Sequence, residues 1–350
     1  MERTMLICVE AVDLDDRAYG FFAEWLLELE RQGVTAIVCC LRRGRMPAYR
    51  AHEIIELPRG GSLISVVRRA LALLRVSWVR RRSYCAVFVR QAPVFLLAAG
   101  WLWRLLGKRV VLWFAHYQTP WMAESAAVFA HSVVTSVPEA CAIRIKKPIV
   151  IGQSVPTERF TIPTDKPFDR FRTVVIGRVS PVKHVPETIE TFLRSAFASR
   201  GGECVILGRA TDDASRDAVT AAIARHPNVT WTAEGVSYDE MPALLGSFDF
   251  TISFCEGSLD KGILEAMACG VIPIIVTRAA VHAIPEPDRW LAVSSYSEAH
   301  DALERAAALS PDERRALANR LRASVVERHS MRSQVQQVIR EAFPGAAHLA

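Results

Sequence analysis

The sequence predicts an α/β fold of two domains in series, each with a parallel sheet covered by helices. Short apolar runs, typical of buried strands, alternate with longer segments in which apolar residues recur at helical spacing. The alternation stops between Pro148 and Phe171, where four prolines and mixed charge indicate a connection, and then restarts. The 350 residues suffice for two domains of about 150 residues each.

In the first half, helical spacing of apolar residues predicts helices around Phe21–Leu29, Leu63–Val79, Pro93–Leu106 and Trp121–Ala130. Apolar runs predict strands at Met5–Glu10, Val34–Leu41, Glu53–Leu57, Cys85–Val89, Val110–Phe114 and Ser132–Thr135. The longest apolar stretch, Ala92–Trp103, is shorter than the ~20 residues of a transmembrane helix, so we expect a buried helix. The run ending at Glu10 is too short for a signal peptide.

In the second half, strands are predicted at Arg172–Ile176, Cys204–Leu207, Val229–Trp231, Phe250–Phe254 and Ile272–Val276. Helices are predicted at Pro186–Phe197, Thr211–Ala224, Met241–Leu245, Ile263–Ala268 and from Ser297 onward. We therefore expect a first domain over residues 1–150, a linker over 151–170 and a second domain over 171–330. A final helix over 331–350 can pack back on the first domain. The ligand cleft is expected between the domains, at the carboxyl ends of the strands.

Charge and cysteine content narrow the classes of function. No acidic residue occurs between Glu56 and Glu124, whereas eleven basic residues do, so the first domain is expected to face an anionic partner. The eight cysteines form no CxxC pair and no metal-ligand spacing, and most lie in apolar runs. This pattern indicates a reducing compartment, no disulfide framework and no metal site.

The first motif is the segment Val174–Lys183. An apolar strand ends at Gly177, which permits close approach of a ligand to the backbone, and two cations follow on the loop. Arg178 and Lys183 can neutralise a diphosphate, one as a planar fork and the other as a point charge. The alternative is that Arg178 and Lys183 are solvated cations on a loop and bind no ligand.

The second motif follows the strand that ends at Phe254. Ser258 can cap the next helix, whose N-terminus suits a phosphate. Glu265 within that helix can accept hydrogen bonds from two ribose hydroxyls, and an exposed helix acid is the alternative. The apolar positions Ile263 and Met267 indicate core packing in either case.

Together, GRVSPVKH (177–184) and EGSLDKGILEAMACG (256–270) resemble the donor half of the retaining glycosyltransferases of family 4. Their fold, GT-B, consists of two Rossmann-like domains facing each other across a cleft. The segments Asn228–Met241 and Gly152–Phe160 resemble the family's approach to the second motif and its interdomain segment. The resemblance extends from about Val110 to Gly270 and is weak before it.

The resemblance implies a nucleoside-diphosphate sugar as donor, UDP- or GDP-linked, and no metal or other cofactor. Arg178 and Lys183 would meet the charge that develops on the diphosphate, and His116 would face the reacting sugar. A purely structural hydrogen bond is the alternative for His116. The residues that would bind the donor are Gly177, Glu256, Gly257, Ser258, Asp260, Lys261, Gly262, Ile263 and Glu265. Retention without an evident nucleophile implies attack on the same face of the sugar.

The sequence departs from the family pattern at three places. Eight residues separate Glu256 from Glu265, where the family has seven. Either a bulge absorbs the extra residue, or Gly257 occupies the expected position and Asp260 supplies the sugar contacts. His184 stands where glycine is common, and Thr277–Ala280 replaces a common glycine pair. These departures leave the choice of sugar open, and they keep a non-catalytic binding protein among the alternatives.

The segment LISVVRRALALLRVSWVRRR predicts a basic amphipathic helix, suited to an anionic membrane surface. Its cations are Arg68, Arg69, Arg75, Arg80, Arg81 and Arg82. An ordinary helix with an arginine-rich outer face is the alternative, and nucleic acid is not expected because no nucleic-acid motif accompanies the patch. We predict a cytoplasmic, peripheral membrane glycosyltransferase that acts on a glycan or lipid-linked acceptor in surface polysaccharide or glycolipid biosynthesis. A nucleotide-sugar epimerase on the same fold is the further alternative.

Overall fold

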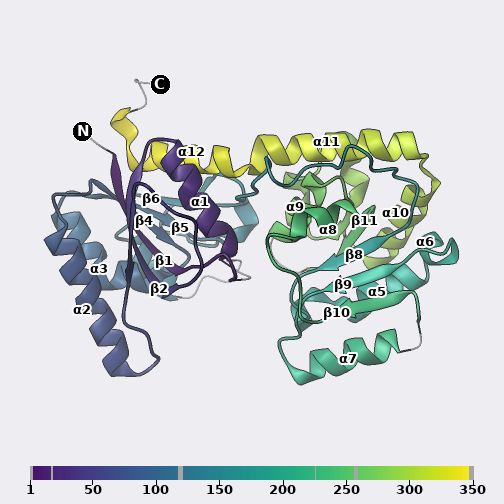
Figure 1. Cartoon of the computed structure of the whole chain (residues 1–350), viewed down its shortest axis with the longest axis horizontal. Coiled ribbons are helices and arrows are strands. Elements are labelled where there is room, and N and C mark those ends of the chain that lie inside the picture. The colour runs from purple at the N-terminus through teal and green to yellow at the C-terminus, as the bar shows by residue number, and fades with distance from the viewer. Residues whose placement is uncertain (1–2, 17–18, 117–120, 225, 256–258, 347–350) are drawn as a thin grey trace. The chain divides into compact units, whose positions relative to one another are not determined.

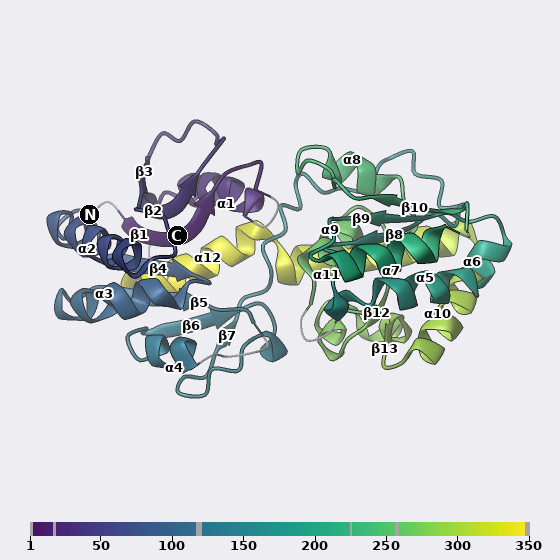
Figure 2. The same cartoon turned by 90° about the horizontal axis from the view of Figure 1, so that it is seen from below.

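The computed structural model describes residues 3–16, 19–116, 121–224, 226–255 and 259–346, and the chain divides into two compact units. Unit 1 comprises residues 1–154 and 331–350, and unit 2 comprises residues 155–330. Each unit is a parallel sheet with helices packed on both faces (Figures 1 and 2). The predicted fold class, two parallel-sheet α/β domains, is confirmed.

The sheet of unit 1 has seven strands, all parallel to their neighbours. They are β1 (Thr4–Val12), β2 (Thr35–Arg43), β3 (His52–Glu56), β4 (Ala86–Arg90), β5 (Arg109–Trp113), β6 (Ser132–Thr135) and β7 (Ile149–Val150). Their order across the sheet is β3-β2-β1-β4-β5-β6-β7. The two-residue β7 was not predicted, because a run of that length has no detectable period.

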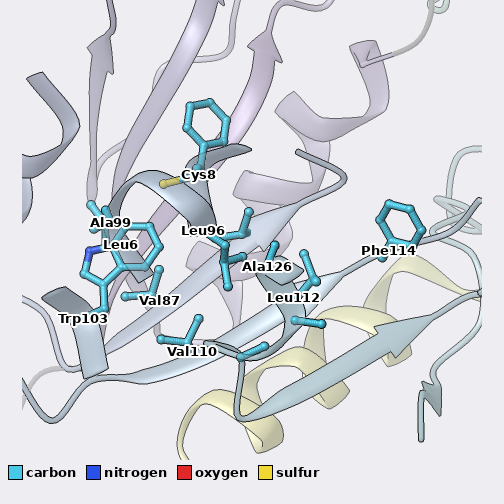
Figure 3. Packing of buried hydrophobic residues seen from close by; sticks show 14 of the residues in the cluster. Leu6, Cys8, Val87, Leu96, Ala99, Trp103, Val110, Leu112, Phe114 and Ala126 are labelled. Atoms are coloured by element: carbon cyan, nitrogen blue, oxygen red, sulfur yellow. The ribbon is translucent and has the colours of Figure 1, made fainter. Parts of the chain in front are cut away.

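In the described part of unit 1, the α-helices that accompany this sheet are α1 (Gly20–Arg31), α2 (Leu63–Val79), α3 (Pro93–Leu105), α4 (Trp121–Ala127) and α12 (Met331–Ala342). Strand side chains alternate between the two faces. Leu6 and Val87 therefore point into a core that they share with Trp103 of α3 and Ala126 of α4 (Figure 3). Leu73 of α2 belongs to the same core. The neighbouring Phe88 points to the other face and stacks on Trp25 of α1 at 5.3 Å. The indole nitrogen of Trp25 in turn donates to Gln334 of α12 (3.0 Å), so α1 and α12 share that face.

The buried helix predicted in Ala92–Trp103 is α3, which is buried on the side that faces the sheet. Trp103 is fully buried, and its indole nitrogen donates to Ser77 Oγ of α2 (2.9 Å), which satisfies its polar atom inside the core. Trp101 and Leu105, on the outer side, are 45% and 77% exposed. The outer side is exposed because a helix in the outer layer of a unit buries only the side that faces the sheet.

The sheet of unit 2 has six parallel strands. They are β8 (Thr173–Ile176), β9 (Cys204–Leu207), β10 (Val229–Thr232), β11 (Phe250–Ser253), β12 (Ile272–Val276) and β13 (Ala292–Val293). Their order is β10-β9-β8-β11-β12-β13. The short β13 was not predicted, for the same reason as β7.

Its helices are α5 (Val185–Leu193), α6 (Ala196–Ser199), α7 (Asp213–Ile223), α8 (Met241–Gly246), α9 (Lys261–Ala268), α10 (Tyr296–Ala308) and α11 (Pro311–His329). The single helix predicted over Pro186–Phe197 was wrong. The helix is interrupted at Ser195. The hydroxyl of this residue accepts a hydrogen bond from the backbone N–H of Phe197 (3.2 Å) and caps the start of α6. Buried Phe192 and Phe197 continue the apolar pattern across the break, so periodicity did not reveal it.

Arginines of α11 hold the segment that enters unit 2. The Arg322 guanidinium donates to the carbonyls of Thr157 (2.9 Å) and Phe160 (2.5 Å). The buried Arg314 donates to the carbonyl of Arg170 (3.0 Å) and lies over the ring of Phe171 at 4.4 Å. These bonds satisfy carbonyls that no strand or helix uses, so residues 157–171 follow a defined path along unit 2.

Candidate functional site

The centre of the unit 2 sheet is the point at which its strand order reverses. Strands β8 and β11 are neighbours there, and the chain turns outward from them in opposite directions. The loops that follow both strands leave from the same carboxyl edge, because the strands are parallel. Open α/β sheets bind ligands at such a switch point. Both sequence motifs lie on these two loops.

Gly177, at the end of β8, has a φ of +121°, which disfavours other residues. A Cβ atom on it would lie 3.5 Å from Lys183 Nζ and 3.6 Å from Asp260 Oδ2. Gly208, at the end of β9, approaches it from the other side, and a Cβ atom there would lie 2.0 Å from the Gly177 carbonyl oxygen. Glycine at 208 therefore lets the loops after β8 and β9 meet closely, whereas glycine at 177 is favoured by its backbone conformation.

Lys183 and Asp260 form a charged pair across these loops. Lys183 ends a 3-10 turn, Pro181–Lys183, and its ammonium group donates to Asp260 Oδ2. The two side chains are only 16% and 22% exposed. Burial disfavours the ammonium form of Lys183, but the Asp260 carboxylate and Cys255 together outweigh burial, so the pKa of Lys183 is raised above its usual value.

Asp260 also caps helix α9. Its Oδ1 accepts from the backbone N–H of Gly262 (3.3 Å), and the helix begins at Lys261. The prediction that Ser258 caps this helix was therefore wrong. Aspartate caps as well as serine does, and its charge gains a second partner in Lys183, 77 residues earlier in the chain. Glu256, Gly257 and Ser258 themselves lie outside the described residues, so the two interpretations of the extra residue stay open.

Glu265 is buried on α9, one turn after Lys261, so the alternative of an exposed acid was wrong. Its Oε1 accepts from the hydroxyl of Tyr238 (2.9 Å) and from the ammonium group of Lys261. The Lys261 ammonium group also donates to the Tyr238 hydroxyl (3.2 Å). Ile263, on the same helix, is buried in the core. The sequence did not single out Tyr238, an isolated aromatic residue on a loop.

The remaining loop positions differ in their surroundings. Arg178 is exposed, and it makes no hydrogen bond or ion pair with the part of the chain that the structure describes. His184 has a φ of +47°, in the left-handed region that glycine favours, which explains why glycine is common at this position in the resembling family. Its ring lies 3.6 Å from Glu187 Oε1.

His116 lies in unit 1, just after the carboxyl end of β5, and is exposed. Gln91, which follows β4, holds this loop. The Gln91 side chain accepts from the backbone N–H of Ala115 (3.0 Å) and donates to its carbonyl (3.4 Å), while the Gln91 N–H donates to the Trp113 carbonyl (2.8 Å). Gln91 has a φ of +59°, a conformation that costs a non-glycine residue about 1–3 kcal/mol. The sequence contained no signal for Gln91.

Helix α2 presents an apolar stripe to the surface. Leu63, Ile64, Val67, Leu71 and Trp78 recur at one-, three-, four- and seven-residue intervals, and Leu63 and Trp78 are 78% and 53% exposed. Exposed large apolar side chains grouped on one side of a helix indicate a binding surface.

The six predicted arginines of this segment have two kinds of surroundings. Arg69 donates to the Pro58 carbonyl (3.1 Å), Arg80 pairs with Glu53 (2.6 Å), and Arg81 lies over the ring of Trp78 at 4.5 Å. The other three make no hydrogen bond or ion pair with the described residues: Arg68, Arg75 and Arg82. These three cations remain available to an anionic partner.

Among the described residues, no group of three or more His, Cys, Asp and Glu side chains could hold a metal ion. No described helix is both long enough and apolar enough to cross a membrane. All eight cysteines are free thiols, and Cys85 alone among them is exposed.

A family model described as glycosyl transferase-like matches residues 186–340. A glycosyltransferase structure from Rickettsia africae is 15% identical, with 99% of each chain covered and a TM-score of 0.73. HepE from Anabaena, solved in complex with UDP, is 14% identical, with 96% of this chain and 98% of that chain covered and a TM-score of 0.71. WaaG, a glycosyltransferase involved in lipopolysaccharide biosynthesis, is 13% identical, with 97% and 100% covered and a TM-score of 0.67.

No curated protein sequence matches the chain significantly. The structural likenesses extend over nearly the whole chain, and they establish the fold. The family match covers α5 to α12 and so includes the loop and helix on which Asp260, Lys261 and Glu265 lie. The chain therefore has the GT-B fold, and its residues 186–340 match the family model described as glycosyl transferase-like.

Proposed function

We propose that this protein is a retaining glycosyltransferase, which moves a sugar from a UDP- or GDP-sugar to a hydroxyl of a glycan or lipid-linked acceptor. The observation that carries the proposal is the convergence of Gly177, Lys183 and Asp260 at the carboxyl edge of β8 and β11, beside the first turn of α9. A cation, an open backbone and helical N–H groups at one point suit a diphosphate. The UDP complex of HepE on the same fold supports this choice of ligand.

Each residue then has a role in the transfer. The bond between the anomeric carbon and the phosphate oxygen breaks, and the electron pair stays on the phosphate. Lys183 and Arg178 stabilise the negative charge that develops there. In other enzymes a bound metal ion stabilises this charge. The acceptor oxygen attacks on the same face and gives its proton to the departing phosphate. Asp260 contacts the sugar hydroxyls, and Glu265 and Lys261 hold the ribose.

In unit 1, His116 faces the reacting sugar, and Gln91 fixes the loop that carries it. The apolar stripe of α2, together with Arg68, Arg75 and Arg82, binds the anionic inner face of the cytoplasmic membrane. A lipid-linked acceptor would be held at the same surface. The involvement of WaaG in lipopolysaccharide biosynthesis supports a place in surface polysaccharide or glycolipid biosynthesis.

The first test is a thermal-shift panel with UDP, GDP, ADP and their sugar conjugates. A ligand at hundredfold excess over its Kd stabilises the fold by about 2.7 kcal/mol. We expect a shift with one nucleotide family, its loss in Lys183→Ala, and its retention in Lys147→Ala, an exposed lysine of unit 1. Absence of any shift in well-folded protein would overturn the proposal.

Turnover separates the transferase from its alternatives. Slow release of nucleoside diphosphate from the donor, lost in Lys183→Ala, supports transfer. Interconversion of two donor sugars without an acceptor indicates an epimerase. Nucleotide binding without either reaction, in the presence of lipid and glycan acceptors, indicates a binding protein.

A further inference from the structure

A pocket of about 640 Å³ lies at the amino edge of the unit 1 sheet. Its floor is formed where strands begin, by Thr4 of β1, Thr35 of β2 and Lys108 just before β5. Its wall is the segment that follows α2, with Arg82 and Ser83. Gln91 and His116 lie at the opposite edge of this parallel sheet, so the pocket is separate from the proposed site of sugar transfer.

The charges that line the pocket do not balance. Arg80, Arg82 and Lys108 are its cations, and Glu53 is the only carboxylate among its described lining residues. Glu53 is already paired with Arg80 at 2.6 Å. Lys108 donates to the carbonyls of Arg81 and Tyr84, both at 2.6 Å, and it pairs with no carboxylate of the described chain. Two cations, Arg82 and Lys108, therefore face the pocket without a counter-charge.

Partial burial makes the positive charge of Lys108 more costly in the absence of an anion. Its side chain is partly buried, and burial lowers its pKa because the charged form is desolvated. Two carbonyl oxygens and the ring of Tyr84, 4.9 Å away, offset part of its charge, but no carboxylate of the described chain neutralises it. A bound anion would supply that neutralising charge. The hydroxyl of Ser83 lies at the same pocket, and the hydroxyls of Thr4 and Thr35 bond to each other there (2.6 Å). Ser83 and one of the two threonines therefore have a donor left for phosphate oxygens.

The border of the pocket is apolar on the side of the helices. Val79, the last residue of α2, precedes Arg80 and is 63% exposed, and Leu105 of α3 lies three residues before Lys108 and is also exposed. Trp78 ends the apolar stripe of α2 at the same point. Phosphate headgroups lie at the boundary between acyl chains and water. A cationic pocket at the end of an exposed apolar stripe matches that boundary.

We propose that this pocket binds the phosphate headgroup of an anionic membrane lipid, with Arg82 and Lys108 as its anion contacts. The proposal rests on the membrane part of the proposed function. It adds a defined binding site for one headgroup to the general electrostatic attraction between α2 and the membrane. It makes no use of the donor site in unit 2.

The test compares two variants that each remove one positive charge from the same surface. Arg82→Gln alters the pocket, whereas Arg75→Gln alters only the exposed side of α2. Binding of the full chain is measured on phosphatidylcholine vesicles with and without phosphatidylglycerol. One surface cation accounts for about fivefold in partitioning. We expect that loss for Arg75→Gln and a loss at least tenfold larger for Arg82→Gln. Soluble glycerol phosphate should compete against the wild type and Arg75→Gln, which keep the pocket, but not against Arg82→Gln.

Equal losses in the two variants would overturn the headgroup site and leave the attraction of α2 for the membrane standing. If glycerol phosphate binds in an Arg82-dependent way while vesicle binding is the same in both variants, the pocket takes a soluble phosphate and the lipid assignment is wrong. If the wild type ignores phosphatidylglycerol, the membrane part of the proposed function fails as well. The nucleotide thermal shift, measured on the same variants, reports separately on the donor site.

Discussion

The ammonium group of Lys183 donates a hydrogen bond to the carboxylate of Asp260, and the pair joins the loops that follow β8 and β11. The same carboxylate caps α9 through the N–H of Gly262. Under the proposed function, a diphosphate meets a cation that is already neutralised and a helix N-terminus that is already capped. Asp260 therefore competes with the donor phosphates for both of their partners.

We expect Asp260→Asn to separate nucleotide binding from transfer. Asparagine still caps a helix, but it leaves the charge of Lys183 unpaired. The affinity for UDP or GDP should rise about fivefold, while turnover falls at least tenfold because the sugar loses its carboxylate. Calorimetric titration and donor-hydrolysis rates measure the two effects. The control is Asp213→Asn, which removes a carboxylate from an exposed pair with Arg216 on α7 and should change neither. Weaker nucleotide binding in Asp260→Asn would contradict the proposed competition.

Tyr238→Phe tests the proposed ribose contact. The substitution keeps the ring, which packs on Phe160 and under Lys261, and removes only the hydroxyl that donates to Glu265. A hydrogen bond to a charged group contributes about 1.5–3 kcal/mol. Glu265 should then lose its orientation. The Tm should fall by several degrees, and the donor Kd, measured well below the Tm, should rise about tenfold. Tyr49→Phe, which removes a hydroxyl bonded to the Ala23 carbonyl in unit 1, is the control. An unchanged Kd would show that the hydroxyl does not orient Glu265 for the donor.

Gln91→Ala should impair the reaction without impairing donor binding. It removes both side-chain hydrogen bonds to Ala115, the residue before His116. Misplacement of a catalytic group by about 1 Å can cost a hundredfold in rate, so we expect at least a tenfold fall in kcat. The nucleotide Kd, set in unit 2, should not change. Gln336→Ala, on the exposed side of α12, is the matched control. A normal kcat in Gln91→Ala would remove the role proposed for this loop.

His329 should make the fold sensitive to acid. The residue is buried at the end of α11, and burial lowers its pKa to about 4 from the usual value near 6.5. The unfolded chain binds a proton there between these values and the folded chain does not. The contribution of neutral His329 to the free energy of unfolding is therefore fully present above pH 6.5 and is lost as the pH falls toward 4. Between pH 7.5 and 5 the loss is about 2 kcal/mol.

The measurement is urea unfolding of wild type and His329→Gln at both pH values. Asp249, whose pKa burial raises to about 6, acts in the opposite direction over part of this range. Its effect cancels in the difference between the two proteins, which should be about 2 kcal/mol larger at the higher pH. His226→Gln, on the loop before β10, should reproduce the wild-type response. An equal loss in wild type and His329→Gln would show that another group controls acid stability.

The sequence by itself determined the type of most elements, because the period of apolar residues is a local property. The pattern of Leu63–Val79 predicted α2 with its observed bounds, and the run Ser132–Thr135 predicted β6. The loop cations Arg178 and Lys183 were also identifiable, since they follow directly on an apolar strand and a glycine. Where a side chain interrupts a helix locally, as Ser195 does between α5 and α6, the apolar period continues across the interruption and conceals it.

Only the tertiary structure decided which of these residues meet. Asp260 reaches Lys183 across 77 residues, and Tyr238 reaches Glu265 across 27, because parallel strands bring the loops after them to one edge of the sheet. Gln91 lies beside Ala115 for the same reason, because β4 pairs with β5. A hydropathy pattern records which side of an element is buried, but it contains no information about the partner against which that side, or the loop at its end, is packed. The elements of this protein follow from its sequence, and the contacts of its candidate site follow from the order of its strands.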